Sequence, residues 1–306
     1  MPMKTPSFWY SDTSSLISLL LRPLLWCYAL GYFIHQMTAR PKKVGVPVIC
    51  VGNLVAGGTG KTPSSISIMG LIKQHKLAET PFFLTRGYGG DEDKILNQHV
   101  LTIINPNRLA GAQDAAARGA DLILMDDGMQ NPRLHKDLKL VVVDGSMGFG
   151  NEYMMPAGPL RQPLKKGLKE ADAFIFIGED HRNVLPLLEH RPIFKAKFKA
   201  LKELSETDKY IAFAGLGYPQ KFFKFLKDKM GDRLVDTIPF PDHHPYNARD
   251  LQKLRERAME MSATLITTEK DAVRLSDKDD DIEVLPVELQ WENESALIEF
   301  IKDELS

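Results

Sequence analysis

The chain has 306 residues, of which 43% are hydrophobic and 26% are charged, a composition typical of globular proteins. Its formal net charge of −1 argues against a general nucleic-acid-binding protein, because such proteins usually carry a basic excess. The two cysteines, Cys27 and Cys50, are too few for a disulfide framework, and there is no cysteine–histidine metal pattern. Both features fit a reducing, cytoplasmic setting. A length prior of roughly 150 residues per domain favours two domains.

Residues 15–34 form an apolar segment, SLISLLLRPLLWCYALGYFI, that contains Arg22 and Pro23 near its middle. A spanning helix needs about 20 apolar residues, and a charge at mid-depth is costly. Basic residues outnumber acidic ones in residues 1–44, which attracts an anionic bilayer. We therefore expect a helix that lies in the membrane surface. A helix packed on its own domain and a single membrane span are the alternatives.

Residues 45–185 are predicted to form a nucleotide-binding domain. The apolar run VPVICVGN predicts a buried parallel strand, and KTPSSISIMGLIKQHKL has its apolar residues at helical spacing. Further strands are predicted in PFFLTRGYGG, HVLTIIN, DLILMDDG, LKLVVVDG and DAFIFIGE, with helices such as RLAGAQDAAARGA between them. This alternation predicts an α/β fold with a doubly wound, mostly parallel sheet.

Residues 186–306 are predicted to form a second, smaller α/β domain. IFKAKFKA alternates like a half-exposed strand. YIAFAGLGYP, RLVDTIPFPD, ATLITTEKD and IEVLPVELQW follow as predicted strands separated by helices. The expected organisation is therefore 1–44, 45–185 and 186–306.

The segment VGNLVAGGTGKTPSS, residues 51–65, lies between a predicted strand and a predicted helix, the context of a phosphate-binding loop. Backbone amides of such a loop cradle phosphate oxygens at a helix N-terminus, Lys61 would reach the phosphates, and the Thr62 hydroxyl would bind magnesium. The strict pattern has glycine where this chain has Val55. A structural glycine turn is the alternative. The predicted nucleotide-binding residues of the loop are Val55, Ala56, Gly57, Gly58, Thr59, Gly60, Lys61 and Thr62.

Asp126 and Asp127 end a predicted strand, at the sheet edge where open α/β sheets bind ligands. With Thr62 they are the predicted magnesium ligands. Asp144 ends the next strand and could instead cap a turn. The motifs of guanine-specific switch proteins are absent from the sequence, so we expect ATP as the nucleotide.

Six segments are long and unusual in combination: VGNLVAGGTGKTP, LTRGYGG, DDGMQNPRLHKDL, VVDGSMGFGNEYMMPAGPLR, FPDHHPY and TTEKDAVRL. Through them the sequence resembles the tetraacyldisaccharide 4'-kinase family of lipid A biosynthesis over essentially its whole length. The resemblance implies magnesium-dependent transfer of the ATP γ-phosphate to the 4'-hydroxyl of a tetraacylated glucosamine disaccharide 1-phosphate. It also implies a membrane-facing N-terminal helix, an active site between two α/β domains, and a peripheral place on the cytoplasmic face of the inner membrane. That family also lacks glycine at the Val55 place.

The resemblance assigns the remaining site residues. Asp91 in Gly90-Asp91-Glu92 matches the general base, in a stretch where GYGGDEDK fuses two family motifs without the spacer between them; Asp93 is the second candidate. His243 or His244 of FPDHHPY pairs with this base. Gln130 matches the Asp-Asp-Gly-x-Gln motif and is expected at the nucleotide. Arg161 and Arg86 are expected to contact phosphate or anionic substrate.

Gln162 stands where the family usually has a glutamate implied in magnesium coordination. An amide oxygen is a weaker, neutral ligand, so we expect metal binding to rely more on Asp126 and Asp127. Two other functions stay open at this point. One is a phosphate-loop ATPase switch, or a protein that delivers a metal or cofactor without lipid kinase activity. The other is a folded but slow member of the kinase family.

Overall fold

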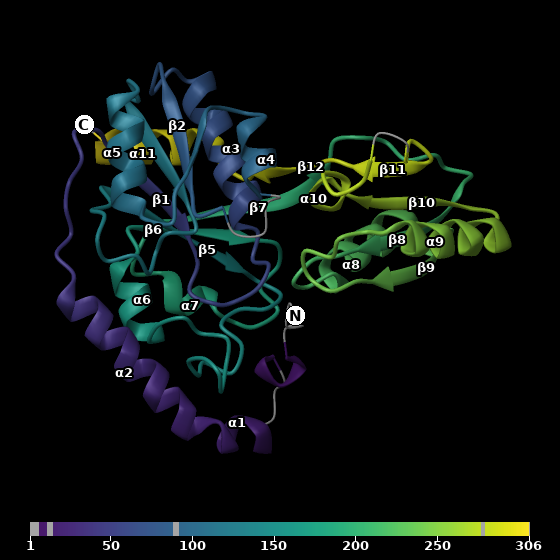
Figure 1. Cartoon of the computed structure of the whole chain (residues 1–306), viewed down its shortest axis with the longest axis horizontal. Coiled ribbons are helices and arrows are strands. Elements are labelled where there is room, and N and C mark those ends of the chain that lie inside the picture. Colours follow the sequence, from purple (N-terminus) through teal and green to yellow (C-terminus); the bar gives the residue numbers. More distant parts are fainter. Residues whose placement is uncertain (1–5, 11–14, 88–91, 277–278, 306) are drawn as a thin grey trace. The chain divides into compact units, whose positions relative to one another are not determined.

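A computed structural model describes residues 6–10, 15–87, 92–276 and 279–305 of the chain. The contacts divide it into two compact units (Figure 1). The larger unit comprises Pro6–Phe198 and Leu289–Ser306, and the smaller comprises Lys199–Glu288. The chain therefore leaves the larger unit once, builds the smaller one, and returns.

The larger unit is built on a sheet that has eight strands in the described residues, in the order β12-β7-β6-β5-β1-β4-β2-β3. Parallel pairing runs from β3 through β7, with Val48 of β1 opposite Ile123 of β4. The strands are β1 (Val48–Gly52), β2 (Pro81–Thr85), β3 (Thr102–Ile104), β4 (Leu122–Asp126), β5 (Leu138–Asp144), β6 (Ala173–Ile177), β7 (Ile193–Ala200) and β12 (Val287–Trp291).

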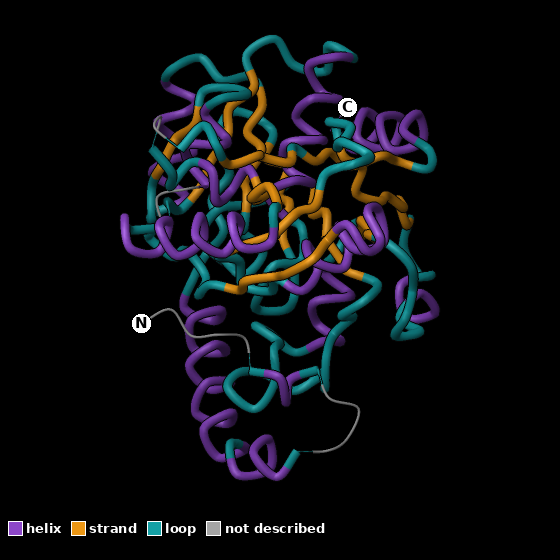
Figure 2. The backbone as a smooth tube through the Cα atoms, turned by 90° about the vertical axis from the view of Figure 1, so that its right-hand side faces the viewer, coloured by secondary structure: helices purple, strands orange, loops and turns teal. Residues whose placement is uncertain are grey.

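Helices cover both faces of this sheet, because successive strand residues point to opposite faces and both sets are apolar (Figure 2). Cys50 packs in one core with Ala112 of α5, and Ile49 packs in the other with Ile68 of α3. The helices of this unit are η1 (Ser7–Trp9), α1 (Leu16–Leu20), α2 (Arg22–Thr38), α3 (Lys61–Gln74), α4 (Glu92–Asn97), α5 (Arg108–Ala117), α6 (Leu164–Glu170), α7 (Leu185–Leu188) and α11 (Glu294–Leu305).

The smaller unit has a parallel sheet of four strands in the described residues, in the order β11-β10-β8-β9. α8 packs on one face through Phe222 and Leu226, and α9 packs on the other through Leu251 and Leu254. The elements are β8 (Lys209–Ala214), α8 (Gln220–Met230), η2 (Gly231–Arg233), β9 (Leu234–Pro239), α9 (Ala248–Met261), β10 (Ala263–Thr268), α10 (Glu269–Ala272) and β11 (Ile282–Leu285).

The predicted fold class, a mostly parallel α/β sheet with a second smaller sheet, is confirmed. The predicted boundary of the second domain at residues 186–306 has to be corrected. IEVLPVELQW is two strands, because Pro286 has no amide hydrogen for a ladder, and its second half is β12 of the larger sheet. IFKAKFKA, as β7, also belongs to the larger sheet, and α11 buries Leu297 and Ile301 in the larger unit.

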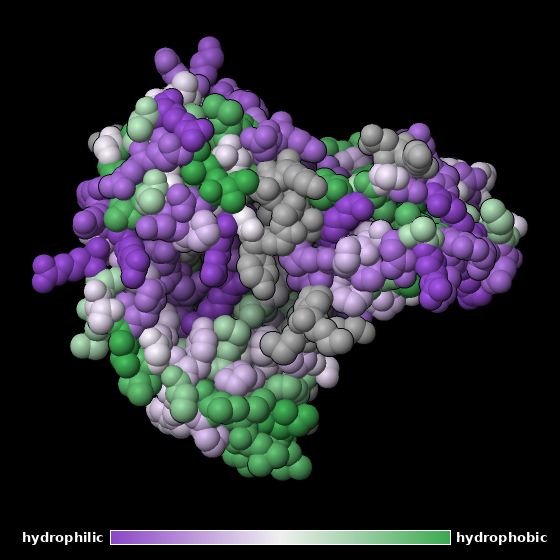
Figure 3. Space-filling view, in the orientation of Figure 1, coloured by the Kyte–Doolittle hydropathy of each residue, from purple (hydrophilic) through white to green (hydrophobic). Residues whose placement is uncertain are grey.

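The N-terminal segment forms two helices, α1 and α2, that meet at Leu21. Ser15 caps α1 by accepting a hydrogen bond from the Ile17 amide. Apolar side chains gather on the outside of both helices, in green at the lower end of Figure 3. Among residues 6–10, 15–87, 92–276 and 279–305, no helix combines the length and the apolar character needed to span a membrane. The exposed apolar residues are Leu16, Ile17, Leu19, Leu20, Leu24, Trp26, Leu30, Phe33, Ile34 and Met37.

Candidate active site

The glycine loop connects β1 to α3, as the sequence predicts. Gly57 and Gly60 have φ of +117° and +92°, conformations that side chains rarely allow. A Cβ atom on Gly60 would also lie 2.8 Å from Cδ1 of Ile177. Gly60 stands directly before the first turn of α3, so the loop amides and the positive end of the helix dipole meet there.

The position of Val55 does not require a glycine, because its backbone is extended and the protein interior accommodates its side chain. It forms a β-bridge with Leu160 and is 3% exposed. On either side, the Ala56 amide donates to the Pro159 carbonyl at 2.7 Å and the Arg161 amide donates to the Leu54 carbonyl at 2.8 Å. The loop therefore begins as a short strand against residues 159–161, and this pairing replaces the glycine turn of the strict motif.

Asn53 closes the base of the loop and was missed from the sequence. Its side chain is fully buried, and its Nδ2 donates to the Val55 carbonyl at 2.7 Å and to Thr59 Oγ1 at 2.8 Å. These two bonds tie the start of the loop to its far side. The only signal in the sequence is the position of Asn53 directly after a buried strand.

Thr62 and Asp126 come together as predicted. Thr62 Oγ1 donates to Asp126 Oδ2 at 3.0 Å, and Ser65 Oγ donates to Oδ1 of the same carboxylate at 2.8 Å. Asp126 is 1% exposed, so its charge depends on these hydroxyls and on the cations nearby. The parallel pairing of β1 with β4 brings the loop and the aspartate to the same edge of the sheet.

Asp127 lies in a different environment from Asp126. Its Oδ1 accepts a hydrogen bond from Arg161 Nη1 at 2.7 Å, and its backbone is left-handed with φ of +53°. Burial alone raises the pKa of Asp127. The positive charges of Lys61, Arg161 and Arg108 outweigh that effect and lower the pKa to about 2. These cations around one carboxylate leave excess positive charge beside the glycine loop, as an anionic ligand requires.

Arg108, the first residue of α5, was also missed from the sequence. It is 4% exposed, and its guanidinium donates to the Asn105 carbonyl at 3.1 Å and to the Asp127 carbonyl at 3.2 Å. A buried arginine at this sheet edge contributes a fixed positive charge. An arginine opening a predicted helix after a strand edge was the available signal.

Gln130 and Gln162 are joined beneath the loop. Gln130 Nε2 donates to the Asn53 carbonyl at 2.9 Å and to Gln162 Oε1 at 3.0 Å. Gln162 is fully buried and donates from Nε2 to Glu170 Oε2 at 2.9 Å. Both ends of the Gln162 amide are therefore engaged within the protein, and a glutamate there would face Glu170 with like charge. The effect of Gln162 on metal binding stays a prediction.

The other predicted residues of the larger unit are Arg86, Asp144, Asp91 and Asp93. Arg86 follows β2, is exposed, and lies near enough to Arg108 for the two positive charges to repel each other. Asp144 accepts from the amide and hydroxyl of Ser146 at 2.9 and 2.6 Å, so it caps the turn after β5. Asp91 lies outside the described residues, and the side chain of Asp93 is likewise not described.

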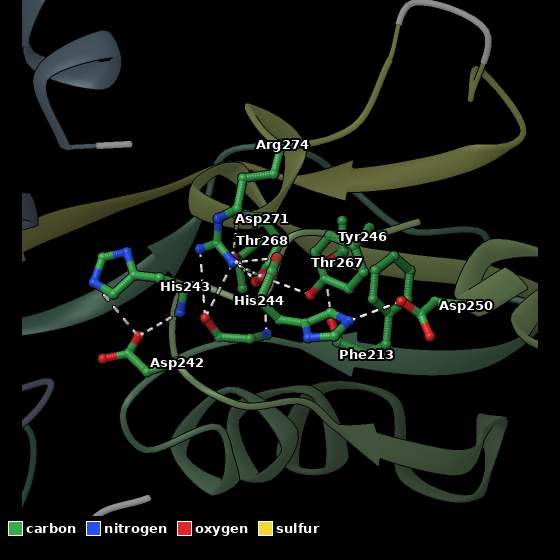
Figure 4. A network of polar contacts seen from close by, with 11 residues as sticks. Phe213, Asp242, His243, His244, Tyr246, Asp250, Thr267, Thr268, Asp271 and Arg274 are labelled. Atoms are coloured by element: carbon green, nitrogen blue, oxygen red, sulfur yellow. Dashed lines mark hydrogen bonds and ion pairs between the residues drawn. The ribbon is translucent and has the colours of Figure 1, made fainter. Parts of the chain in front are cut away.

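His243 and His244 lie in the smaller unit and have different surroundings (Figure 4). His244 Nε2 is 2.9 Å from Asp250 Oδ2, and its ring stacks against Phe240. The ring of His243 points away from these residues, with Nε2 3.8 Å from Asp242 Oδ1. His244 is thus tied to the start of α9. His243 is the histidine of the pair whose ring is turned out of this network.

Asp271 of the TTEKD segment holds the loop that carries His243. This fully buried carboxylate accepts from the Gly215 amide at 2.8 Å and from the Tyr246 hydroxyl at 2.7 Å, and it pairs with Arg274 at 3.2 Å. Arg274 in turn donates to the carbonyls of Gly215 and His244. The His243 amide bonds to the Gly215 carbonyl, so one buried ion pair fixes this loop.

The residues at the sheet edge fit a magnesium ion in part. Thr62 and Asp126 supply a hydroxyl and a carboxylate oxygen, the hard ligands that magnesium prefers. Asp127 is instead held by Arg161. Within the described ranges, no three His, Cys, Asp or Glu side chains gather as a metal cage. Magnesium at such a site takes its remaining ligands from phosphate oxygens and water, which is its usual coordination in kinases.

The parallel sheet, the glycine loop and the strand-edge aspartates define an α/β protein of the phosphate-loop class. The family model described as "Tetraacyldisaccharide-1-P 4'-kinase" matches residues 17–99 and 89–306. The chain belongs to this family, and the predicted resemblance is confirmed. The match divides at residues 89–99, where the sequence indicates a missing spacer.

Two relatives and one solved structure illustrate the likeness. Tetraacyldisaccharide 4'-kinases of Paramagnetospirillum magneticum and Rhodospirillum centenum are 41% and 38% identical. Each alignment covers 96% of this chain and 97% and 95% of those proteins. The structure of LpxK from Aquifex aeolicus, solved in complex with ATP, is 24% identical, with a TM-score of 0.72 over 95% of this chain and all of that one. That likeness confirms the fold.

Proposed function

We propose that the chain transfers the γ-phosphate of ATP to the 4'-hydroxyl of a tetraacylated glucosamine disaccharide 1-phosphate, giving the 1,4'-bisphosphate. Family membership supplies the reaction and the substrate class. The observation of this structure that carries the phosphotransfer is the contact between Thr62 and Asp126, which joins the glycine loop to the neighbouring strand edge. This pairing supports a phosphate loop over a purely structural glycine turn.

The loop amides and Lys61 bind the phosphates of ATP, and Arg161 and Arg108 add positive charge where charge spreads over the transferred group. Thr62 and Asp126 would hold magnesium, which neutralises phosphate charge when it is bound. By the family resemblance, Asp91 is the base that orients the sugar hydroxyl and His243 is its partner. Asp91 lies outside the described residues, so both roles stay predictions. Arg86 is available for an anionic group of the substrate. Positioning of this kind suits a loose phosphoryl-transfer transition state.

The kinase acts as a peripheral protein at the cytoplasmic face of the inner membrane. The exposed apolar residues of α1 and α2 support this, because a soluble protein rarely exposes so many large apolar side chains on one helix pair. Inserted in the bilayer surface, these helices would keep the acyl chains of the substrate in lipid while the sugar reaches the site.

Radiolabelled ATP with a tetraacylated disaccharide 1-phosphate tests the reaction. We expect a labelled lipid whose formation requires magnesium. Hydrolysis of ATP that is stimulated by a partner protein, without labelled lipid, would instead support an ATPase switch. Lys61→Ala is the matched negative control, because it removes the phosphate-binding cation at the first residue of α3.

Trp26 reports on membrane binding, because it is 72% exposed on the apolar side of α2. We expect its fluorescence to shift to the blue with vesicles that contain anionic lipid, and Trp26→Phe to abolish this shift. A spectrum that vesicles leave unchanged would contradict the membrane assignment.

A further inference from the structure

The face of α2 that contacts the rest of the protein, here called the inner stripe, is narrow, and several of its side chains end in a polar group. Leu25, Tyr28, Tyr32 and Gln36 are the partly buried residues that recur about once per helical turn, while the residues between them are mostly exposed. On the outer side, Leu30 is 62% exposed and Met37 is 85% exposed. A surface helix normally turns its apolar side inward and its polar side outward. α2 is apolar on its outer side as well as on the side that packs against the core, so the hydroxyl and amide groups of its inner stripe need a specific explanation.

Tyr28 bonds to the backbone of Arg161. Its hydroxyl donates to the Arg161 carbonyl at 3.1 Å. The Arg161 amide donates in the opposite direction to the Leu54 carbonyl, directly before the glycine loop. Arg161 is therefore held on one side by α2 and on the other by the loop, while its side chain reaches Asp127.

Gln36 bonds to the backbone of Gln130. Its Nε2 donates to the Gln130 carbonyl at 3.1 Å. Lys136 donates to the carbonyls on either side, those of Met129 and Asn131. Three successive carbonyls of the segment after Asp127 are thus bound by side chains, and one of these comes from α2.

Tyr32 lies between Tyr28 and Gln36 on α2 and is connected to the Gln162–Gln130 contact through Lys166 and Glu170. Lys166 Nζ is 4.9 Å from the centre of the Tyr32 ring and 3.7 Å from Glu170 Oε1. Glu170 accepts the hydrogen bond from Gln162, which also contacts Gln130. Tyr28 and Gln36 therefore bond directly to the backbones of Arg161 and Gln130. Tyr32 is linked to Gln130 indirectly, through Lys166, Glu170 and Gln162.

We propose that Tyr28 and Gln36 are positioning residues for the phosphotransfer, acting through the backbones of Arg161 and Gln130. This inference rests on the proposed function for its readout in turnover. The lipid-facing helix then has two separable tasks: its outer side holds the membrane, and its inner stripe fixes the geometry of the nucleotide site. If Tyr28 or Gln36 loses its donor group, the carbonyl of Arg161 or Gln130 has to bond to water or move. A displacement of catalytic groups by a fraction of an ångström lowers the rate of the reaction.

Two near-isosteric variants test the inner stripe, Tyr28→Phe and Gln36→Met, with Leu30→Ala and Met37→Ala as controls from the outer side of the same turns. Rates are measured over a wide range of lipid concentration in mixed micelles. We expect each inner variant to lower kcat about fivefold, the effect of roughly 1 kcal/mol, with little change in KM for lipid. The outer variants should raise that KM and keep kcat at saturation. Inner variants with the wild-type kcat would overturn the proposal.

Two further measurements do not depend on lipid turnover. A fluorescent ATP analogue should bind the inner variants about fivefold more weakly than the wild type or the outer variants. Hydrogen exchange should be faster in residues 128–133 and 159–163 of the inner variants, with melting temperatures close to that of the wild type. If the wild type made no labelled lipid, the proposed reaction would fail, and these two measurements would still decide on the coupling. Equal nucleotide affinity in all four variants would overturn it.

Discussion

Arg161 and Asp127 form an ion pair beside the glycine loop, with Nη1 2.7 Å from Oδ1, and both side chains remain partly exposed. The pair joins two segments that are far apart in the sequence, the end of β4 and the loop before α6. Because Arg161 is also bonded through its backbone to the start of the glycine loop, it connects the aspartate to the phosphate-binding amides.

Arg161→Ala should therefore lower kcat/KM by about 100-fold, roughly the 3 kcal/mol that follows from removing one partner of a hydrogen-bonded charge pair. Steady-state kinase rates measure this. Arg118→Ala is the control, since Arg118 pairs with Asp114 at 2.9 Å on an exposed helix surface and should change the rate by less than about twofold. Comparable losses in both variants would contradict a specific role for Arg161.

The ionisation of Asp127 should affect stability only in acid. Its pKa is lowered from the ordinary value of 3.8 to about 2 in the folded protein, so the charged form stabilises the fold. That contribution is complete above pH about 4 and is lost as the pH falls toward about 2. Urea unfolding of Asp127→Asn across this range should show a shallower loss of stability than the wild type. Identical slopes would refute the pKa assignment.

Gly60→Ala should weaken nucleotide binding strongly, by about tenfold or more, because φ of +92° strains an alanine and its Cβ meets Ile177. Titration with a fluorescent ATP analogue measures the affinity. Gly70→Ala, in the same helix α3 with open space around its Cβ, is the control. It should bind normally and gain up to about 1 kcal/mol of stability. The outcome against this view is an unchanged affinity in Gly60→Ala.

Asp271→Asn should destabilise the smaller unit by about 3 kcal/mol or more, because it leaves the buried Arg274 without its carboxylate. Hydrogen exchange of β8 and β10 follows this unit separately from the larger one. Asp236→Asn, which removes one of the two carboxylate partners of the exposed Arg257, should leave this protection nearly unchanged. Similar protection in the two variants would show that the Asp271–Arg274 pair does not hold the unit together.

The sequence predicted the features that depend on short-range pattern. Runs such as LILM, residues 122–125, are apolar at every position because both faces of the sheet are covered, and the glycines of the loop mark the turn from β1 into α3. Thr62 and Asp126 were predicted to meet because parallel strands end at the same edge. The family resemblance extended this to the reaction, which pattern alone leaves open.

The parts that were missed depend on long-range contacts. Val55 is explained only by its pairing with Leu160, about one hundred residues later. Arg108 and Asn53 are buried polar residues that bond mainly to backbone carbonyls, so no spacing rule indicates them. The boundary after β7 was missed because composition does not change where a chain crosses from one sheet to the next. Only the pairing of the returning strand reveals that crossing.

The return of the chain through β12 has a consequence for how the protein is made. Residues 6–198 are synthesised before α11, whose apolar residues Leu297, Ile298 and Ile301 complete a core that α3 covers only in part. The area that α11 covers stays exposed until the whole inserted unit has been synthesised. The Leu201 amide bonds to the Pro286 carbonyl, so a folded insertion holds the two connecting segments side by side and spares the larger sheet a long loop closure. Folding of the smaller unit is thus a step in completing the larger one. A nascent chain that stalls before α11 exposes apolar surface that promotes aggregation.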